Sequence, residues 1–351
     1  MFKRLVISLA LLLVLVIVAA AAFNYVYQGM LEPADPAATD DYKVVEIPSG
    51  ATTETIASIL KNEELIQNEL AFRYYVRSKD LGRGFQAGTY QFSPAMNVSQ
   101  IAEKITAGDV YTETKWFTIP EGYTIEKMSE KLEAEGLVDS ELFLELAASP
   151  PDYIRASFPY LQGIDDPDID YLLEGYLYPD TYQIDLDAGE EEIIKLMLNT
   201  LDEIITEERK QRAEELGLSI HEILTIASLV EREAAVDHER DVIAGVIYNR
   251  LAIGQLLQID ATIQYILGET KEFLTYADLE VPSPYNTYQN AGLPPGPIAA
   301  PGKPSINAAL YPEDNDYFYY NYKYDDTGEH YFSYTFEEHL NNVRRAEENL
   351  Q

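Results

Sequence analysis

The stretch SIHEILTIASLVERE (219–233) predicts a buried helix that ends in two acidic residues. Its start carries the capping-box pattern, Ser219 followed three positions later by Glu222, so we expect the helix to begin at Ile220. Every residue from 223 to 230 is uncharged. Because carboxylates are seldom placed against a buried helix without a partner or a chemical role, Glu231 and Glu233 are the first candidates for catalysis.

Glu231 continues the apolar face of this helix, which contains Ile220, Leu224 and Ala227 at steps of four and three residues. The residues one turn before it, Ala227 and Ser228, are small and leave space beside its carboxyl group. A carboxyl group on an apolar face beside such a space is suited to act as a general acid. The alternative is an ordinary acidic helix end that emerges into solvent.

Glu233 lies one helical turn after the bulky residues Leu229 and Val230. Three roles are open for it. A second carboxylate close to Glu231 would tune the acidity of that residue. Glu233 is otherwise a solvated side chain, or one that forms an ion pair with Arg232 or Arg240.

The composition excludes several classes of protein. The 351 residues carry a formal charge of −35, so a surface of this chain would repel nucleic acids. There are no cysteines, and therefore neither disulfides nor a lipidated cysteine. The four histidines lack a recognised metal spacing, and no P-loop, GxGxxG or GxSxG pattern occurs. We therefore expect no metal and no cofactor.

The N-terminal sequence predicts a membrane anchor. Lys3 and Arg4 precede an uncharged run over 5–23 that, as a helix, would span roughly 28 Å, about one hydrocarbon core. Basic residues before the run and acidic residues after it place segment 1–4 in the cytoplasm and the body outside it. The alternative is a cleaved signal peptide, with Ala19–Ala22 supplying the small residues of a cleavage site. A linker over 24–43 would follow.

A repeat precedes the catalytic candidates. The stretch IPSGATTETIASILKNEELIQNEL (47–70) returns as IPEGYTIEKMSEKLEAEGLVDSEL (119–142), with ten identities in 24 positions. Each copy is predicted to end a strand, turn at Pro-x-Gly and start a helix capped by Thr52 or Thr124. A strand or hairpin and a short helix are expected between the copies. The repeat is either a binding or spacer module, or a structural arm built by duplication.

Further elements are expected downstream. Residues 188–218 read as helical, 149–171 as an irregular connection, and 237–254 as a second helix that carries Asn249 and Arg250. Tyrosines at 317–324 predict a strand that packs alternate aromatic residues, followed by a turn.

Several motifs occur in an order that resembles the YceG-like family of endolytic murein transglycosylases. They are LEGYLYPDTY (173–182), ASLVERE (227–233), VIYNRL (246–251), LQIDATIQY (257–265), YNTY (285–288), GLPPGPIAAPG (292–302) and HYFSYTFEEH (330–339). The resemblance covers roughly 44–345. It implies an α+β fold with a single N-terminal transmembrane helix, a LysM-like module over 44–115, a second repeat unit over 116–150, a connection over 151–172 and a mixed α+β catalytic domain over 173–345.

The resemblance also implies which residues act. It assigns catalysis to the first glutamate of the VE-x-E pattern, Glu231. It marks as substrate-binding candidates Tyr285, Tyr288, Asn286, Asp260, Gln258, Asn249 and Arg250. The chain departs from the family pattern at Ile259 and Ala261, where LQSDPT is usual, and around His330 and His339, which puts details of the groove in doubt.

By resemblance, the reaction is cleavage of the β-1,4 bond between N-acetylmuramic acid and N-acetylglucosamine within peptidoglycan strands, leaving a 1,6-anhydro end and helping to end strand growth. One acid suffices, because the C6 hydroxyl of the substrate is the nucleophile. The expected partners are glycan strands, the membrane, and proteins of cell-wall synthesis and division or elongation. Two alternatives remain: a catalytically silent wall-binding scaffold, and a two-carboxylate glycoside hydrolase that uses Asp260 or Glu233.

Overall fold

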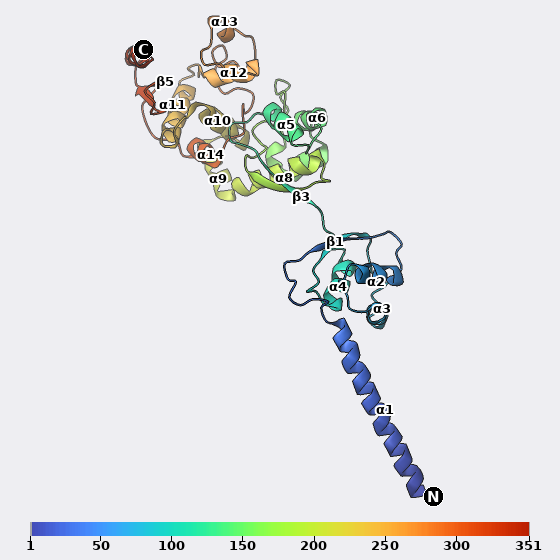
Figure 1. The fold of residues 1–351 in the computed structure, drawn as a ribbon. Coiled ribbons are helices and arrows are strands. Elements are labelled where there is room, and N and C mark those ends of the chain that lie inside the picture. Colours follow the sequence, from blue (N-terminus) through green and yellow to red (C-terminus); the bar gives the residue numbers. More distant parts are fainter. Residues whose placement is uncertain (1, 351) are drawn as a thin grey trace. The chain divides into compact units, whose positions relative to one another are not determined.

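The computed structural model describes residues 2–350, except for the side chains of residues 2–6, 8 and 10. Within these residues the chain is α+β, as expected, and its strands form three separate two-stranded antiparallel sheets. The chain divides into two compact units, Met1–Glu113 and Thr114–Gln351 (Figure 1).

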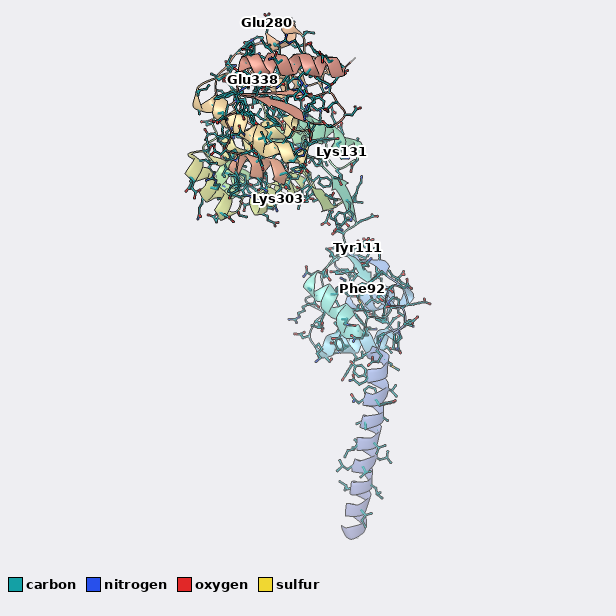
Figure 2. All side chains as sticks on the ribbon, turned by 90° about the vertical axis from the view of Figure 1, so that its left-hand side faces the viewer. Phe92, Tyr111, Lys131, Glu280, Lys303 and Glu338 are labelled. Atoms are coloured by element: carbon teal, nitrogen blue, oxygen red, sulfur yellow. The ribbon has the colours of Figure 1, made fainter. Side chains whose placement is uncertain are left out.

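The N-terminal helix α1 (Phe2–Leu31) is long and apolar enough to cross a membrane over Leu11–Leu31. The side chains over 11–26 are exposed (Figure 2), whereas Tyr27 packs edge-to-face against Tyr74 of α3. The expected apolar helix is thus present, but it continues through residues 24–31, where a linker was predicted, and ends just before Pro33, which disfavours further helix. The side chains of the predicted cytoplasmic segment 1–4 lie outside the described residues.

The rest of unit 1 is a small α/β fold with one two-stranded sheet. Its elements are β1 (Lys43–Ile47), α2 (Thr53–Asn62), α3 (Glu69–Ser78), β2 (Gly88–Phe92) and α4 (Val98–Ala107). Strands β1 and β2 pair in antiparallel register, and alternate residues such as Tyr90 and Phe92 pack against the helices. The strand and helix expected between the two repeats are therefore present.

The second repeat has the same order of elements, β3 (Thr114–Thr118), α5 (Ile125–Ala134) and α6 (Ser140–Ala148). Thr52 accepts a hydrogen bond from the Thr55 N–H at 3.2 Å, and Thr124 accepts one from the Lys127 N–H at 3.3 Å, so both predicted caps are confirmed. The second copy, however, pairs β3 with β4 (Thr181–Asp185) and packs into the core of unit 2.

The rest of unit 2 is helical with one C-terminal hairpin. Its elements are α7 (Asp152–Ser157), a 3-10 turn (Pro159–Leu161), α8 (Glu190–Ile204), α9 (Glu207–Leu216), α10 (Ile220–Glu233), α11 (Arg240–Ala252), α12 (Asp260–Leu267), α13 (Tyr276–Leu279), α14 (Lys303–Leu310), β5 (Tyr319–Tyr322), β6 (His330–Ser333) and α15 (Phe336–Asn349).

Helix α10 begins at Ile220 as predicted. Ser219 accepts a hydrogen bond from the Glu222 N–H at 3.2 Å, and Glu222 accepts one from the Ser219 N–H at 2.8 Å. The single helix expected over 188–218 is two helices, α8 and α9, because Ile205 turns into the core and Thr206 caps α9. The connection over 149–171 is likewise more regular than expected, since α7 and the 3-10 turn bury apolar side chains in the main core.

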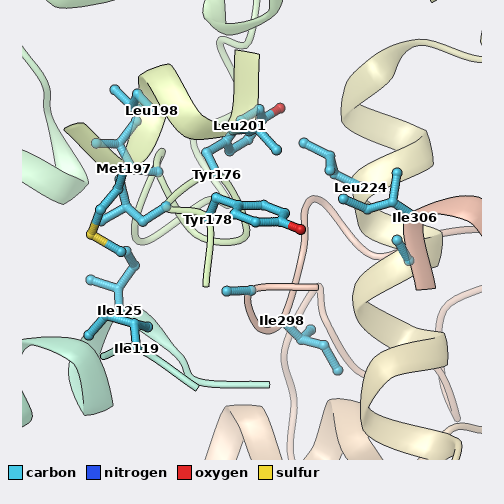
Figure 3. Close-up of a cluster of buried hydrophobic side chains, with 14 of the residues drawn as sticks. Ile119, Ile125, Tyr176, Tyr178, Met197, Leu198, Leu201, Leu224, Ile298 and Ile306 are labelled. Atoms are coloured by element: carbon cyan, nitrogen blue, oxygen red, sulfur yellow. The ribbon is translucent and has the colours of Figure 1, made fainter. Parts of the chain in front are cut away.

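Helix α10 is the centre of this core. All its residues from 223 to 230 are buried, and α14 and α11 pack beside it. Figure 3 shows Leu224 of α10 beside Ile306 of α14, and Met197 of α8 beside Ile119 of the second repeat. Because one core joins all these elements, only the two ends of α10 are partly exposed, and its last turn carries Glu231 and Glu233.

The close approach of Gly175 to Pro297 gives a first test. Gly175 has φ +77°, and a Cβ there would lie 2.3 Å from the Pro297 Cβ. Gly175→Ala should therefore lower the free energy of unfolding by about 2–4 kcal/mol, combining backbone strain with overpacking. The matched control is Gly136→Ala, at φ +70° but with no atom within 4 Å, which should cost only about 1 kcal/mol. Denaturant unfolding of both variants measures the difference, and equal losses would contradict the close contact.

Candidate active site

A pocket of about 410 Å³ opens in unit 2 where the end of α10, the start of α12 and the C-terminal hairpin meet. Its walls are mainly aromatic and polar. The lining residues are Glu233, Arg250, Gln258, Asp260, Tyr288, Tyr319, Tyr320, Asn321, Tyr322, Tyr324, His330, Phe336 and His339. Flat aromatic faces with interspersed polar groups suit a carbohydrate, whose rings present apolar faces and hydroxyl edges.

Glu233 is the carboxyl group of this pocket whose acidity is most changed. Burial raises its pKa to about 7, and the nearby Asp260 carboxylate adds to the rise. The Tyr320 hydroxyl, which hydrogen-bonds to Glu233, and the Ala261 N–H oppose it. Glu233 therefore keeps a large protonated fraction at neutral pH, which is what a general acid requires.

Asp260 begins α12 and faces the same pocket. The Tyr288 hydroxyl donates a hydrogen bond to its Oδ1 atom. Thr287, the residue before Tyr288, accepts a hydrogen bond from the Ile259 N–H at 2.9 Å and so fixes the start of α12. The unusual Ile259 and Ala261 are both buried, so these departures from the family pattern add apolar contacts behind Asp260.

Arg250 and Gln258 complete the predicted residues that the structure brings to the pocket. Arg250 is buried, donates from Nε to the Phe318 carbonyl at 2.6 Å, and lies 5.3 Å from the centre of the Tyr319 ring. It thereby ties α11 to the hairpin. Gln258 has φ +48°, a strained conformation for a residue with a side chain, and its N–H donates to the Thr287 carbonyl at 3.1 Å.

Glu231 lies elsewhere, in a buried ion pair. Its Oε1 accepts from Arg240 Nη1 at 3.2 Å, and its Oε2 accepts from the Gly302 N–H at 2.9 Å. Arg240 also donates to the Ser305 hydroxyl at 2.5 Å. Both carboxylate oxygens of Glu231 thus have hydrogen-bond partners, and the assignment of catalysis to this residue stays a prediction. Glu233, for its part, is partly buried and lines the pocket.

Three other predicted site residues have contacts outside the pocket. Asn286 donates to the Leu279 and Val281 carbonyls at 3.0 and 2.8 Å and organises its loop. Asn249 donates to the Asn315 and Tyr317 carbonyls at 2.8 and 2.9 Å. Tyr285 is buried in a different cavity of unit 2.

Sequence reasoning missed the contribution of the C-terminal hairpin. Strand β5, expected to pack its aromatic residues structurally, forms a wall of the pocket with Tyr319, Tyr320 and Tyr322. The signal was present, because a two-stranded sheet cannot bury tyrosines on both of its faces. His330 on β6 was also missed as a pocket residue, and its Nδ1 lies 2.7 Å from the buried Glu239 carboxylate.

No described group of three or more His, Cys, Asp or Glu side chains is arranged to hold a metal ion. Besides its carboxyl groups and tyrosines, the pocket presents Arg250, Gln258, Asn321, His330 and His339.

Comparison with known proteins identifies the family of the chain. The sequence model of the YceG-like family matches residues 45–345, most of the chain. The chain belongs to the YceG-like family. A relative from Bacillus subtilis (strain 168), named endolytic murein transglycosylase, is 37% identical over 323 residues, covering 89% of this chain and 86% of that relative.

Other YceG-like relatives extend the comparison. Proteins with the same name from two Streptococcus pneumoniae strains, D39 and R6, are 31% identical over 344 residues. These alignments cover 92% of this chain but only 61% of the pneumococcal proteins. A crystal structure of a YceG-like protein from Listeria monocytogenes is 38% identical, with a TM-score of 0.61, and the match covers 86% of this chain and 99% of that one.

The buried pair of this YceG-like chain gives a second test. Glu231 and Arg240 have side chains only 6% and 10% exposed, so Arg240→Met leaves a buried carboxylate without its cation. We expect a loss of about 3–5 kcal/mol in the free energy of unfolding.

Adding Glu231→Gln to Arg240→Met should recover part of that loss, because the unpaired charge is removed. Lys210→Met, which breaks an exposed pair with Glu207, is the control and should cost less than about 1 kcal/mol. A loss in Arg240→Met no larger than in this control would show that the buried pair does not stabilise the fold.

Proposed function

We propose that this protein is a membrane-anchored endolytic lytic transglycosylase that cleaves peptidoglycan glycan strands. The observation that carries the proposal is the Glu233 carboxyl group, whose pKa burial raises to about 7 in a pocket walled by tyrosines. The relatives named endolytic murein transglycosylase support the substrate class. The bond cut is the β-1,4 bond between N-acetylmuramic acid and N-acetylglucosamine, inside nascent strands.

The reaction needs one acid that later acts as a base. The protonated carboxyl group donates its proton to the glycosidic oxygen as the bond from C1 to that oxygen breaks. The C6 hydroxyl of the N-acetylmuramic acid then forms a bond to C1, and the carboxylate takes the hydroxyl proton. The acid is thereby regenerated without a water molecule, and the products carry a 1,6-anhydro end and a free hydroxyl end.

The geometry favours Glu233 over Glu231 as this acid. Glu233 lines the pocket and is held partly protonated, whereas both oxygens of Glu231 have partners, one of them a buried guanidinium. The role of Glu231 in this proposal is to hold Arg240 and Gly302 against α10. The assignment of catalysis to Glu231 stays a prediction of the sequence, and the two glutamine variants below decide between them.

Asp260 lies beside the acid with the Tyr288 hydroxyl bonded to it, where a negative charge can stabilise the positive charge that develops at C1. The same placement favours a second candidate function. If Asp260 acts as nucleophile or base, the protein is a two-carboxylate glycoside hydrolase, and its product carries an ordinary reducing end.

The other parts of the chain fit the proposed substrate. Helix α1 would hold the protein in the cytoplasmic membrane with both units outside the cytoplasm, close to where new strands are made. Residues 44–115, the LysM-like module of the sequence analysis, would bind glycan. Cleavage close to where new strands are made would end strand growth. Proteins of cell-wall synthesis and division or elongation would be the neighbours of this enzyme.

Mass spectrometry of the cleavage products tests the proposal. The full chain in detergent is incubated with uncrosslinked strands, beside Glu233→Gln, Glu231→Gln and Asp260→Asn. Glu233→Gln should lose about 100- to 10,000-fold in rate, the contribution typical of a general acid, with folding retained. Wild-type fragments should be one water lighter than hydrolysis products.

Each other outcome has a definite meaning. A comparable loss in Glu231→Gln alone, with its unfolding curve unchanged, would return catalysis to Glu231. Fragments of full hydrolytic mass would make the protein a hydrolase. Strand binding without cleavage by the folded wild type would make it a scaffold.

The pH profile is a separate test of the acid. Because the reactive form of Glu233 carries a proton and its pKa is about 7, kcat/KM should fall as the pH rises through about 7, approaching tenfold per pH unit above it. The measurement is kcat/KM from pH 5 to 9, with circular dichroism at each pH as the control for folding. A decline centred near pH 4.5 would instead indicate a carboxyl group of ordinary acidity.

A further inference from the structure

A second cavity, of about 300 Å³, lies at the other end of α12 from the catalytic pocket. Asp260 at the start of α12 lines the pocket, and Leu267 at its end lines the cavity. An eight-residue helix rises roughly 10 Å between its first and last residues. The two spaces are therefore separated by a distance that an extended substrate can span.

Two buried polar atoms of this cavity have no hydrogen-bond partner within the described chain. Glu174 is 1% exposed, and its Oε2 accepts from the Ile125 N–H at 3.1 Å, while its Oε1 has no partner. Tyr285 is 3% exposed, and its hydroxyl has no partner. A buried polar group left unsatisfied costs about 1–3 kcal/mol. Both residues line the same cavity, so a ligand bound there lies next to both side chains.

The chemistry of the walls selects the ligand. Three carboxyl side chains line the cavity, Glu126, Asp170 and Glu174, together with the rings of Tyr171, Tyr265 and Tyr285, and no lysine or arginine is among the lining residues. An ammonium group brings hydrogen-bond donors for carboxyl oxygens and a positive charge for aromatic faces. A metal ion fits less well, since no described cluster of acidic residues or histidines is arranged to hold one.

We propose that this cavity binds a primary ammonium group carried by the peptide that is attached to the glycan strand. This inference rests on the proposed peptidoglycan substrate and adds a specificity site to it. Burial raises the pKa of Glu174 to about 8, so the group is largely protonated at neutral pH, and an arriving ammonium would favour its ionised form.

The loop with the sequence YNTY connects this site to the reaction centre. Tyr285 lines the cavity, Tyr288 lines the pocket, and Thr287 between them binds the Ile259 N–H at the start of α12. A smaller hollow of about 90 Å³ lies along α12 as well, and its walls include Tyr265 of the cavity and Arg232, which adjoins Glu233. Binding the ammonium group would thus fix the position of the strand relative to Glu233.

Direct binding tests the site without relying on activity. Isothermal titration of the full chain in detergent compares a stem peptide that has a free lysine amine with the same peptide acetylated on that amine. We expect the acetylated peptide to bind at least about tenfold more weakly, the effect of losing one charge-assisted contact. Glu174→Gln and Tyr285→Phe should each weaken binding of the free amine by a similar factor.

Further variants serve as controls for folding and for the location of the binding site. Glu174→Gln resembles the protonated acid, and Tyr285→Phe removes an unpaired hydroxyl, so neither should lower the unfolding temperature. Tyr288→Phe, in the same loop but at the other pocket, should leave peptide affinity unchanged. Equal affinity for the two peptides, or unchanged affinity in both cavity variants, would overturn the proposal.

Cleavage of strands distinguishes a strand-borne peptide from a free one. Strands that carry peptides should have a lower KM than strands stripped of them, with similar kcat, and Glu174→Gln should remove the difference. Equal KM values for both strands would show that the cavity does not position the strand, while the proposed reaction stands. Amine-dependent peptide binding without cleavage of either strand would instead reject the proposed reaction and retain the site.

Discussion

The burial of the middle of α10, residues 223 to 230, is the constraint on which the rest of unit 2 depends. Its middle residues pack against α14, α11, α12 and α9. The Ser228 hydroxyl is also bonded, donating to the Thr225 carbonyl at 2.7 Å and accepting from the Ile298 N–H at 3.0 Å. A helix packed in this way cannot rotate or shift without opening the core. The directions in which its last side chains point are therefore fixed.

This rigidity gives the two terminal glutamates different environments. Residues two apart on a helix point about 200° apart, so Glu231 and Glu233 cannot share a face. Glu231 stays on the packed side and meets the Arg240 guanidinium and the Gly302 N–H. Glu233 faces the pocket, where burial and the Asp260 carboxylate favour its protonated form. The Glu231 carboxyl group is thus held by fixed partners, whereas the Glu233 carboxyl group faces an open pocket.

Adjacent residues of the loop after α13 likewise have different environments. In the motif YNTY, Asn286 binds carbonyls of its own loop, Thr287 fixes the start of α12, and the two tyrosines enter different spaces. A short polar motif of this kind combines support and recognition, because adjacent side chains of an irregular loop point in different directions. Removing the supporting residues would displace the recognising ones.

The α+β class followed from resemblance to a family, whereas the sequence by itself determined the apolar N-terminal helix, the repeated strand–helix unit with its Thr52 and Thr124 caps, and the start of α10. These features depend on local periodicity and capping, which are written in consecutive residues. It also identified a set of polar candidates from motifs. It did not separate those that line the pocket, such as Asp260 and Tyr288, from those that act as internal supports.

Only the tertiary structure decided which glutamate meets the pocket, that Arg240 pairs with Glu231, and that tyrosines of β5 form a wall opposite α12. It also placed Glu174 and Tyr285 in one cavity, although they are far apart in the chain. The physical reason is that burial, and the pKa it changes, depend on which distant segments pack around a side chain. Helical spacing shows that a residue continues an apolar face, but not whether that face meets a cation, a ligand pocket or water.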